Sequence, residues 1–358
     1  MSSKILEGPK LKSTIPVKCL GQLFFECAEK YSDRICQVDG TIDQSETYAS
    51  VKQRSTRVAI ELQKRGITSN DVISNCSSNT LDAAIPILAT FYLGAKVTNL
   101  EPTLSVRHTQ HVISLVLPKI IFVEESAVDL IEESLKAINF EAEIIVYGKS
   151  TKYSNLSELT TPKDSEDSFR PAEVDFHEIA IMFFSSGTTG LPKAICHTHY
   201  SFMHIGFTLL DYGNGKAVFH FSSFYWITAM FMLIYSHMVG GYRVFCQAVE
   251  PGTSFKAIEK YKVETLFMSS NLATKLTSFK RSRDYDTSSL RIILCGGSPI
   301  PPSQYQKLVE LFKNSNIISV YGMTEAGIIS QFHPDLDQEF LRTKTKSCGK
   351  PIYAIKLK

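Results

Sequence analysis

The stretch Ser185-Ser186-Gly187-Thr188-Thr189-Gly190-Leu191-Pro192-Lys193, here called the phosphate loop, directly follows the apolar segment Ile179–Phe184, which predicts a β-strand. It holds four hydroxyl side chains, two glycines and one lysine within nine residues. Glycines let backbone N–H groups turn toward a bound anion, hydroxyl groups add donors, and a lysine supplies a point charge for phosphate oxygens. The stretch therefore predicts a loop that binds a polyphosphate at the end of a strand.

The phosphate loop is not a Walker A motif, which has four residues between its glycines and a Ser or Thr after its lysine. Here two residues separate the glycines, and Ala194 follows the lysine. The alternative is a polar turn between a strand and a helix. The lysine and both glycines, occurring together after an apolar strand, favour the phosphate site.

Two further motifs containing glycine lie later in the chain. Gly296-Gly297-Ser298-Pro299 follows the apolar segment Leu290–Cys295, and Tyr321-Gly322-Met323-Thr324-Glu325 comes after it. Taken alone, the first is an ordinary loop. The second, taken alone, is a strand end leading into a helix, with Thr324 as cap and Glu325 complementing the helix dipole. Their occurrence together with the phosphate loop favours a nucleotide site.

These three motifs resemble, in sequence and in order, the signatures of the adenylate-forming (AMP-binding) superfamily. That superfamily includes acyl-CoA synthetases, 4-coumarate-CoA ligases, firefly luciferases and peptide-synthetase adenylation domains. Thr198-His199 continues the resemblance after the loop lysine, and Tyr321–Glu325 matches without departure. The similarity extends from about Cys19 to the last residue, so the chain is identified as a member of the branch that contains the CoA ligases and luciferases.

The resemblance implies that a carboxylate attacks the α-phosphorus of ATP and releases pyrophosphate, with catalysis by positioning and charge neutralisation. It implies that the phosphate loop holds the β- and γ-phosphates, that Tyr321 stacks on adenine, and that Gly296-Gly297 admits the adenine edge. Thr324 would donate to the α-phosphate and Glu325 would help to hold Mg²⁺. The implied cofactor-binding residues are Ser185, Ser186, Gly187, Thr188, Thr189, Gly190, Gly296, Gly297, Ser298, Pro299, Tyr321 and Gly322, and the implied catalytic residues are Lys193, His199, Thr324 and Glu325. For His199 two roles stay open, contact with the substrate and orientation of a loop.

The segment Ser223–Thr228 is expected to line the pocket for the acid. Relatives that activate amino acids carry an Asp there, which pairs with the ammonium group of the substrate. This segment contains no carboxylate, and a buried ammonium without a partner is costly, so we expect a fatty or aromatic carboxylic acid. Tyr225 and Trp226 are the candidate pocket residues, with a place in the core as the alternative for Trp226. Ser269-Ser270-Asn271 departs from the Pro-containing run of the family, which leaves the length of the acyl chain open.

The composition predicts a globular protein of about two domains or subdomains. Of 358 residues, 44% are hydrophobic and 21% are charged, and a net charge of +2 gives no reason to expect nucleic acid or a membrane surface as partner. The eight cysteines include no Cys-x-x-Cys pair, which argues against zinc and disulfides and favours a reducing compartment. Met1–Thr14 lacks the apolar run of a signal peptide, and Phe224–Tyr235 is too short to span a bilayer, which predicts a buried helix.

Strand and helix patterns alternate along the first part of the chain. Helices are predicted from a cap at Thr47 to Gly66, from Asn79-Thr80 to Gly94, at Ser105–Leu115 and at Ala127–Ile138, and strands at Asp71–Ser74, Lys119–Val123 and Glu143–Tyr147. Apolar strands between helices predict an α/β fold with a largely parallel sheet covered on both faces. The resemblance implies two such stacked sheets, as in the large N-terminal domain of adenylate-forming enzymes, with the start of a β-barrel subdomain at the C-terminus.

We expect four parts along the chain. Residues 1–148 form a first α/β subdomain, 149–178 a polar and partly disordered surface connector, 179–346 a second α/β subdomain with the ATP motifs, and 347–358 the first strand of an incomplete β-subdomain. The ATP motifs would line the crevice between the two subdomains. Ile352–Lys358 is predicted to be a strand with an apolar face and nothing following to cover it. The resemblance implies that a C-terminal lid domain should follow, so we expect the chain to be truncated.

The expected function is that of an AMP-forming acyl-CoA synthetase that uses ATP and Mg²⁺, with CoA as co-substrate in the complete enzyme. The alternatives are a pseudoenzyme that binds ATP or an acyl ligand, and an inactive truncated form. The expected partners are small molecules, with no transmembrane segment. The expected location is the cytoplasm or the peroxisome, although the tail Lys356-Leu357-Lys358 is not the Ser-Lys-Leu peroxisomal address.

Overall fold

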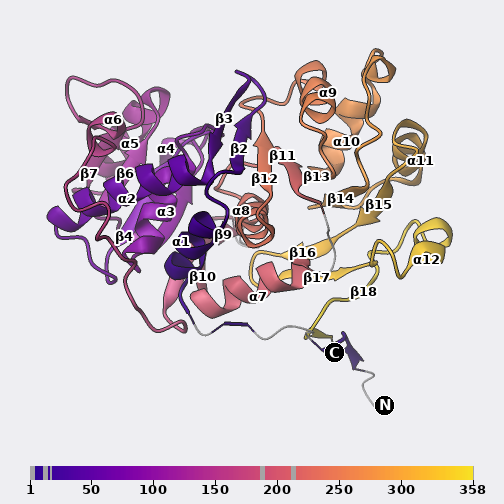
Figure 1. Cartoon of the computed structure of the whole chain (residues 1–358), viewed down its shortest axis with the longest axis horizontal. Coiled ribbons are helices and arrows are strands. Elements are labelled where there is room, and N and C mark those ends of the chain that lie inside the picture. Colours follow the sequence, from indigo (N-terminus) through magenta and orange to yellow (C-terminus); the bar gives the residue numbers. More distant parts are fainter. Residues whose placement is uncertain (1–4, 11–14, 17, 186–189, 211–214, 358) are drawn as a thin grey trace.

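The computed structural model describes residues 5–10, 15–16, 18–185, 190–210 and 215–357 (Figure 1). Within them, two seven-stranded sheets alternate with layers of helices, which confirms the predicted α/β fold with two mostly parallel sheets. Two small sheets complete the description. One has three strands, β16 (Tyr321–Met323), β17 (Gly327–Gln331) and β18 (Lys350–Pro351), and the other pairs β1 (Leu6–Glu7) with β19 (Lys356–Leu357).

The first large sheet has the strand order β10-β9-β5-β4-β6-β7-β8. Its neighbours pair in parallel, except for the antiparallel pair of β9 and β10. The apolar faces of α4 (Val106–Val116) and α5 (Val128–Ala137) cover one side of this sheet. The strands are β4 (Val72–Cys76), β5 (Lys96–Leu100), β6 (Ile120–Val123), β7 (Glu143–Val146), β8 (Ser154–Asn155), β9 (Ile179–Ser185) and β10 (Lys193–Thr198), and a 3₁₀ turn, η1, spans Glu125–Ala127.

The second large sheet has the order β15-β14-β13-β11-β12-β2-β3, in parallel except for the pair of β2 and β3. Its outer face packs on α9 (Pro251–Lys260), α10 (Ser270–Thr277) and α11 (Pro302–Leu311). The strands are β2 (Ile35–Asp39), β3 (Gln44–Thr47), β11 (Ala217–His220), β12 (Tyr242–Phe245), β13 (Thr265–Ser269), β14 (Ile292–Gly296) and β15 (Asn316–Ser319), and two short helices, η2 (Ser282–Asp284) and α12 (Gln338–Thr343), lie in the connections.

A shared core lies between the two sheets. Alternate residues of one sheet, such as Val97 and Phe122, and of the other, such as Val218 and Phe267, belong to one buried cluster. The longer helices in this cluster are α1 (Leu20–Lys30), α2 (Tyr48–Lys64), α3 (Ala84–Tyr92), α7 (His199–Leu210) and α8 (Ile227–Val239). Because the inner faces of both sheets contribute to one core, the two halves form a single packed unit.

The two sheets do not follow the expected boundaries near residues 148 and 179. Strands β2 and β3, from the first 50 residues, complete the second sheet, whereas β9 and β10, after residue 178, complete the first. Each half of the chain therefore gives a strand pair to the sheet of the other half. Local periodicity predicts strands but does not say which neighbour a strand chooses, because pairing depends on contacts distant in sequence.

The predicted cap at Thr47 is confirmed, and the helix predicted at Ser105–Leu115 begins one residue later, with Ser105 as its cap. The side chain of Thr47 accepts from the N–H of Ser50, and that of Ser105 accepts from the N–H of His108. The predicted helix from Asn79 starts later, at Ala84. Pro86 then lies in the first turn, where its missing N–H costs nothing. Residues 79–83 form a loop instead, and its Asn79 donates to the Phe221 carbonyl.

The expected connector at 149–178 is more ordered than its polar composition suggests. It contains β8 and a short helix, α6 (Leu156–Leu159). Leu156, Leu159 and Phe169 are buried in the shared core. Three apolar side chains thus tie the segment to the sheet, a signal too sparse to appear as a periodic pattern.

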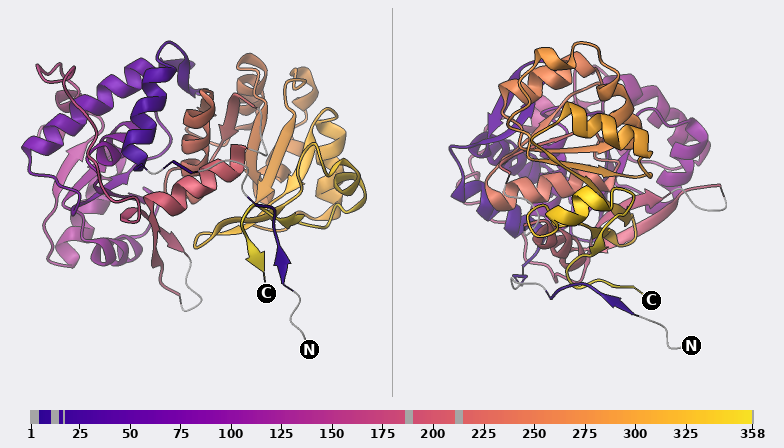
Figure 2. Two further views of the ribbon diagram at one scale, coloured as in Figure 1. Left: turned by 60° about the horizontal axis from the view of Figure 1, so that its bottom comes forward. Right: turned by 90° about the vertical axis from the view of Figure 1, so that its right-hand side faces the viewer.

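The C-terminal residues differ from the predicted strand over 352–358. Tyr353 is buried, and Ala354 has a left-handed backbone with φ of 60°, which interrupts the extended conformation. Only Lys356–Leu357 is a strand, and it pairs antiparallel with Leu6–Glu7, so the two ends of the chain lie side by side (Figure 2). The edge that was expected to be unpaired has a partner in the N-terminal segment.

The apolar α8 is short and buried, as predicted. It spans 13 residues, and most of them lie in the shared core. In the described part of the chain, none of the helices has both the length and the apolar character needed to cross a membrane.

Acidification is expected to destabilise the fold below pH 6.5. His199, His220 and His237 are buried, and burial lowers their pKa values to about 4, 3 and 3. Below about pH 6.5 the unfolded chain takes up protons that the folded chain resists, so stability falls by about 1.4 kcal/mol per histidine and pH unit. Thermal unfolding midpoints should therefore fall between pH 6.5 and 5. The exposed His177→Asn control should keep the same slope, and midpoints independent of pH over this range would contradict the prediction.

Candidate active site

Four segments of the candidate site follow neighbouring strands of the second sheet. Strands β11, β13, β14 and β15 are parallel neighbours, with His220 opposite Phe267, Ser269 opposite Gly296, and Cys295 opposite Ser319. The segments after them are residues 221–226, 270–271, 297–299 and 320–325. Since the carboxyl ends of parallel strands meet at one edge, these segments gather there, where open α/β sheets bind their ligands.

The phosphate loop lies on the first sheet, between β9 and β10. Residues 186–189, and with them the predicted roles of Ser186, Gly187, Thr188 and Thr189, lie outside the described residues. At the flanks, Ser185 pairs with Lys193 across the antiparallel strands, and the Lys193 side chain is exposed. Gly190 has φ of 107°, a conformation that favours glycine. His111 Nε2 donates to the Pro192 carbonyl at 2.9 Å, which fixes the second flank against α4.

The Gly296–Pro299 motif turns sharply at the end of β14. Gly296 is buried in the strand, while Gly297, Ser298 and Pro299 are exposed. Gly297 has φ of 85°, and a Cβ there would meet nothing within 4 Å, so the backbone conformation and not space requires glycine. The hydroxyl groups of Ser270 and Ser298 are hydrogen-bonded, which joins this turn to the segment after β13.

The Tyr321–Glu325 motif forms a hairpin with β17 and does not lead into a helix. A Cβ on Gly322 would lie 2.5 Å from the Gly327 carbonyl oxygen, so glycine permits the close approach of the two strands. The Tyr321 side chain is 51% exposed, which leaves its ring available for stacking. Thr324 is half-buried and Glu325 is exposed at the turn.

His197 joins the first large sheet to the β16–β17 hairpin, and no motif in the sequence singles it out. It lies on β10, four residues after Lys193, and its Nε2 donates to the Thr324 carbonyl at 2.7 Å. Burial lowers the pKa of His197, which keeps the imidazole neutral at physiological pH. The strand of the phosphate loop is thereby held against the turn that carries Thr324 and Glu325.

Replacing His197 by alanine should weaken that connection without unfolding the protein. The lost hydrogen bond contributes on the order of 1 kcal/mol, so we expect nucleotide-dependent activity to fall up to about tenfold. His197→Gln, which keeps a donor, should recover part of the loss. The exposed His177→Ala is the matched control. Equal ATP affinity in His197→Ala and the unchanged chain would show that the contact has no role in the site.

His199, a predicted catalytic residue with two open roles, is fully buried at the start of α7. Its Nδ1 accepts from the backbone N–H of Leu20 at 3.1 Å, which links α7 to the start of α1. Burial lowers its pKa to about 4. This environment favours the orienting role over contact with a substrate.

The segment Ser223–Thr228, predicted to line the acid pocket, follows β11 of the second sheet and contacts β9 of the first. The Tyr225 ring stacks on Phe184 of β9, with centroids 6.2 Å apart, and packs edge-on against Trp226 at 5.3 Å. The Trp226 side chain is 56% exposed, which argues against its core alternative. Both candidate pocket residues therefore lie beside the strand that leads into the phosphate loop.

A carboxylate approaches this segment from an element distant in sequence. Ser223 Oγ donates to Glu101 Oε2 at 2.5 Å, just after β5. Burial raises the pKa of Glu101, and burial together with the nearby charge of Glu101 raises the pKa of Tyr225. The absence of a carboxylate within Ser223–Thr228 was the reason to exclude amino acids. Glu101 removes that reason, because the fold supplies a carboxylate that the segment lacks.

The donor chemistry at the hairpin fits the implied Mg²⁺. The exposed Glu325 carboxylate is an oxygen ligand of the kind Mg²⁺ prefers. Among the residues that the structure describes, no group of three or more His, Cys, Asp or Glu side chains could hold a metal alone. Magnesium bound with nucleotides usually takes one or two carboxylates and completes its shell with phosphates and water, which one carboxylate satisfies.

Comparison with known proteins agrees with this geometry. The sequence profile described as AMP-binding enzyme matches residues 24–358. The chain is 25% identical over 346 residues to 4-coumarate-CoA ligase 1 of Narcissus pseudonarcissus, covering 93% of this chain and 62% of the ligase. It is also 25% identical to luciferin 4-monooxygenase of Nipponoluciola cruciata over 99% of this chain and 67% of that protein. The chain thus spans less than two thirds of the length of the 4-coumarate-CoA ligase.

Two solved structures share the fold over nearly the whole of this chain. The luciferase-like enzyme from the nonluminescent Zophobas morio mealworm superposes with a TM-score of 0.95 at 49% identity, covering 98% of this chain and 83% of that one. A long-chain-fatty-acid-CoA ligase from Archaeoglobus fulgidus shares the fold, with a TM-score of 0.86 at 19% identity over 97% of this chain and 71% of that one.

Proposed function

This chain belongs to the AMP-binding family of adenylate-forming enzymes, and from that membership we propose that it activates a carboxylic acid as an acyl-adenylate, as the first step of an acyl-CoA synthetase. The observation that supports the proposal is the contact between the strand after the first motif and the turn of the third motif. The three motifs follow β9, β14 and β15 in the sequence, and His197, on β10 after the first motif, donates to the Thr324 carbonyl within the third.

In the proposed step a carboxylate oxygen of the acid attacks the α-phosphorus of ATP. A bond forms between that oxygen and phosphorus, the bond to the bridging oxygen of the β-phosphate breaks, and pyrophosphate leaves with the electron pair. The carboxylate is already ionised at neutral pH, so no general base is required. The protein must align the two reactants and neutralise phosphate charge.

Different residues of this chain would align the reactants and neutralise the phosphate charge. Lys193 supplies positive charge at the flank of the phosphate loop, and Thr324 donates to the α-phosphate. Tyr321 offers its exposed ring to adenine. Glu325 would hold Mg²⁺, which would offset phosphate charge when bound. Tyr225 and Trp226 would contact the acid, in the region where Phe184 and Glu101 contact the same segment.

The proposed acid is a fatty or aromatic one, and CoA is the proposed acceptor in the complete enzyme. The apolar rings of Phe184, Tyr225 and Trp226 support an apolar acid. Because Glu101 brings a carboxylate to the same segment, acids that also carry an amino group belong in the comparison.

The test is exchange of labelled pyrophosphate into ATP in the presence of Mg²⁺ and a panel of acids. The panel should hold medium- and long-chain fatty acids, cinnamic-type aromatic acids and amino acids. Exchange that depends on a fatty or aromatic acid would support the proposal. Tight ATP binding without exchange for any acid would instead indicate a nucleotide-binding pseudoenzyme. Exchange with amino acids alone would contradict the proposed acid class.

A further inference from the structure

The segment Phe221–Trp226 is held by partners at four successive residues, and these partners come from both sheets. The Phe221 carbonyl accepts from Asn79 Nδ2 at 3.1 Å, and the Ser222 carbonyl accepts from His220 Nδ1 at 3.0 Å. Ser223 donates to Glu101, as described above. The fourth contact, at Phe224, is of a different kind.

The Phe224 ring lies against the guanidinium of Arg243, at 4.7 Å from its centroid. Arg243, on β12, is 1% exposed, and the Phe245 ring lies against the same guanidinium at 5.0 Å. Aromatic faces attract a guanidinium through the negative charge of the ring face, and the attraction grows when water is excluded. Burial lowers the pKa of Arg243 to about 10, which leaves it charged at neutral pH.

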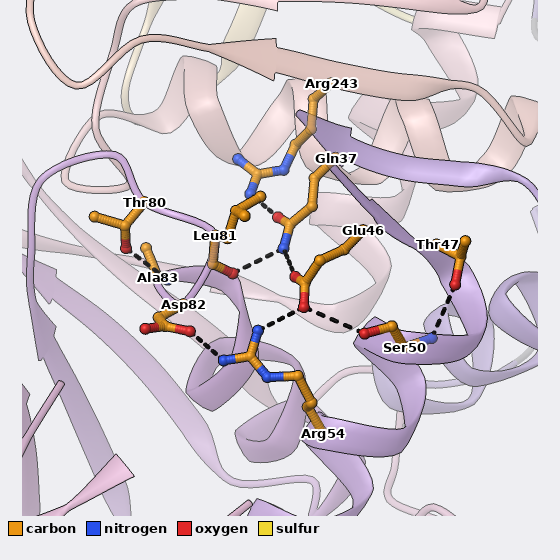
Figure 3. A network of polar contacts seen from close by, with 10 residues as sticks. All are labelled: Gln37, Glu46, Thr47, Ser50, Arg54, Thr80, Leu81, Asp82, Ala83 and Arg243. Carbon is orange, nitrogen blue, oxygen red and sulfur yellow. Dashed lines mark hydrogen bonds and ion pairs between the residues drawn. The ribbon is translucent and has the colours of Figure 1, made fainter. Parts of the chain in front are cut away.

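A hydrogen-bonded chain leads from Arg243 to the other half of the molecule (Figure 3). Arg243 Nη2 donates to Gln37 Oε1 at 2.6 Å. Gln37 Nε2 in turn donates to Glu46 Oε2 at 2.6 Å and to the Leu81 carbonyl at 2.7 Å. Glu46 accepts from Arg54 Nη1 at 2.7 Å, and Arg54 also pairs with Asp82.

The hydrogen-bond network returns to the segment Phe221–Trp226 through the loop that precedes α3. Leu81 and Asp82, which the network contacts, lie two and three residues after Asn79, which binds the Phe221 carbonyl. Phe221 and Phe224 are therefore held at one end by this loop and at the other by Arg243, and Gln37 connects the two. The outer end, around Glu46, Arg54 and Asp82, borders a polar cavity of about 420 Å³.

Stability gives no reason to keep an arginine at this position. A buried ion pays a desolvation cost, and replacing buried ionic groups by apolar residues of similar size is often neutral or stabilising. The network instead acts on a segment whose next residues, Tyr225 and Trp226, reach the candidate acid pocket. A buried charge with fixed partners confers one defined geometry where apolar packing would tolerate several.

We propose that Arg243 is a positioning residue that sets the geometry of the acid-binding segment through Phe224, and that Gln37, Glu46 and Arg54 hold Arg243 in place from β2, β3 and α2. Tyr225 and Trp226 then present one surface to the acid. The inference rests on the proposed function for its activity readout, but its structural part concerns the segment alone.

Trp226 makes the inference testable without activity. It is the only tryptophan in the chain and is 56% exposed, so its fluorescence reports directly on this segment. Arg243→Met removes the charge and the donors while keeping an unbranched side chain, and Arg243→Lys keeps the charge alone. Arg57→Met is the matched control, because Arg57 pairs with Glu166 away from the segment. Arg54→Met tests the outer end of the network, in case Arg243→Met does not fold.

In the full chain we expect Arg243→Met to raise the acrylamide quenching constant of Trp226 about twofold, with cooperative unfolding retained. The KM for the acid should rise about tenfold while the KM for ATP stays within about twofold. Arg243→Lys should lie between, Arg54→Met should change both readouts in the same direction by less, and Arg57→Met should change neither.

Unchanged quenching and unchanged acid KM in Arg243→Met, even with a lower unfolding midpoint, would overturn the inference and leave Arg243 a structural residue. An equal rise in the KM values for acid and ATP would overturn it as well, since that pattern indicates general loosening. If the unchanged chain shows no acid-dependent exchange, the proposed function fails, while the Trp226 measurement still decides this inference.

Discussion

Lys193→Ala should slow acid-dependent exchange of pyrophosphate into ATP by a factor of about 10² to 10³, the cost of removing one charge contact to a transition state. The Lys193 side chain is exposed at the start of β10, directly opposite Ser185, so it can reach a phosphate without rearrangement. Because it packs against nothing essential to the core, the unfolding midpoint should stay within about 2 °C.

Two control variants separate the effect of the Lys193 charge from the effect of removing any exposed lysine. Lys193→Arg keeps a positive charge with different geometry and should retain part of the activity. Lys307→Ala removes an exposed lysine from α11, outside the three motifs, and should exchange at the unchanged rate. Exchange at the unchanged rate in Lys193→Ala itself would refute the assignment of the phosphate site.

Glu325→Gln should lower the exchange rate about 10²-fold at a fixed, low Mg²⁺ concentration, with partial recovery as Mg²⁺ is raised. The side chain is exposed at the turn of the β16–β17 hairpin, and an amide has the size of the carboxylate without its charge. The loss should therefore reflect metal affinity more than folding. The measurement is the exchange rate as a function of Mg²⁺ concentration.

Glu310→Gln, an exposed carboxylate on α11, is the matched control and should leave the Mg²⁺ dependence unchanged. A Glu325→Gln variant with lower activity but the same Mg²⁺ dependence would place Glu325 outside the metal site. It would then leave the hairpin with a role in nucleotide positioning only.

Much of the fold was predictable because its elements carry local signals. Thr47 caps its helix as predicted, the helix predicted from Ser105 begins one residue later, and the apolar runs at β6 and β7 are strands within one residue of the prediction. Strand exchange between the halves was not predictable, because β2 reads like any short strand until its partner β12 is known. The burial of residues within 149–178 was not predictable for a similar reason, because the neighbours of Phe169 in the sequence are polar.

Some residues of the candidate site were likewise predictable from the sequence, and others were not. Its motifs were recognisable because chemistry dictates contiguous residues, as in Tyr321–Glu325. His197, Glu101 and Arg243 were not recognisable, because each depends on a residue more than a hundred positions away in sequence: Thr324 for His197, Ser223 for Glu101 and Gln37 for Arg243. A lone histidine on a strand or a lone arginine in an apolar run has no local pattern that distinguishes it. Only strand pairing and packing between segments distant in sequence bring such side chains to the candidate site.

The central claim, that the acid is activated on the α-phosphorus of ATP, is tested most directly by isotope transfer. The full chain is incubated with ATP, Mg²⁺, hydroxylamine as acceptor, and an acid labelled with ¹⁸O in its carboxylate, and the AMP released is analysed by mass spectrometry. Attack of the carboxylate on the α-phosphorus predicts AMP that carries one ¹⁸O atom, together with pyrophosphate. ADP with labelled inorganic phosphate, or unlabelled AMP, would contradict the account.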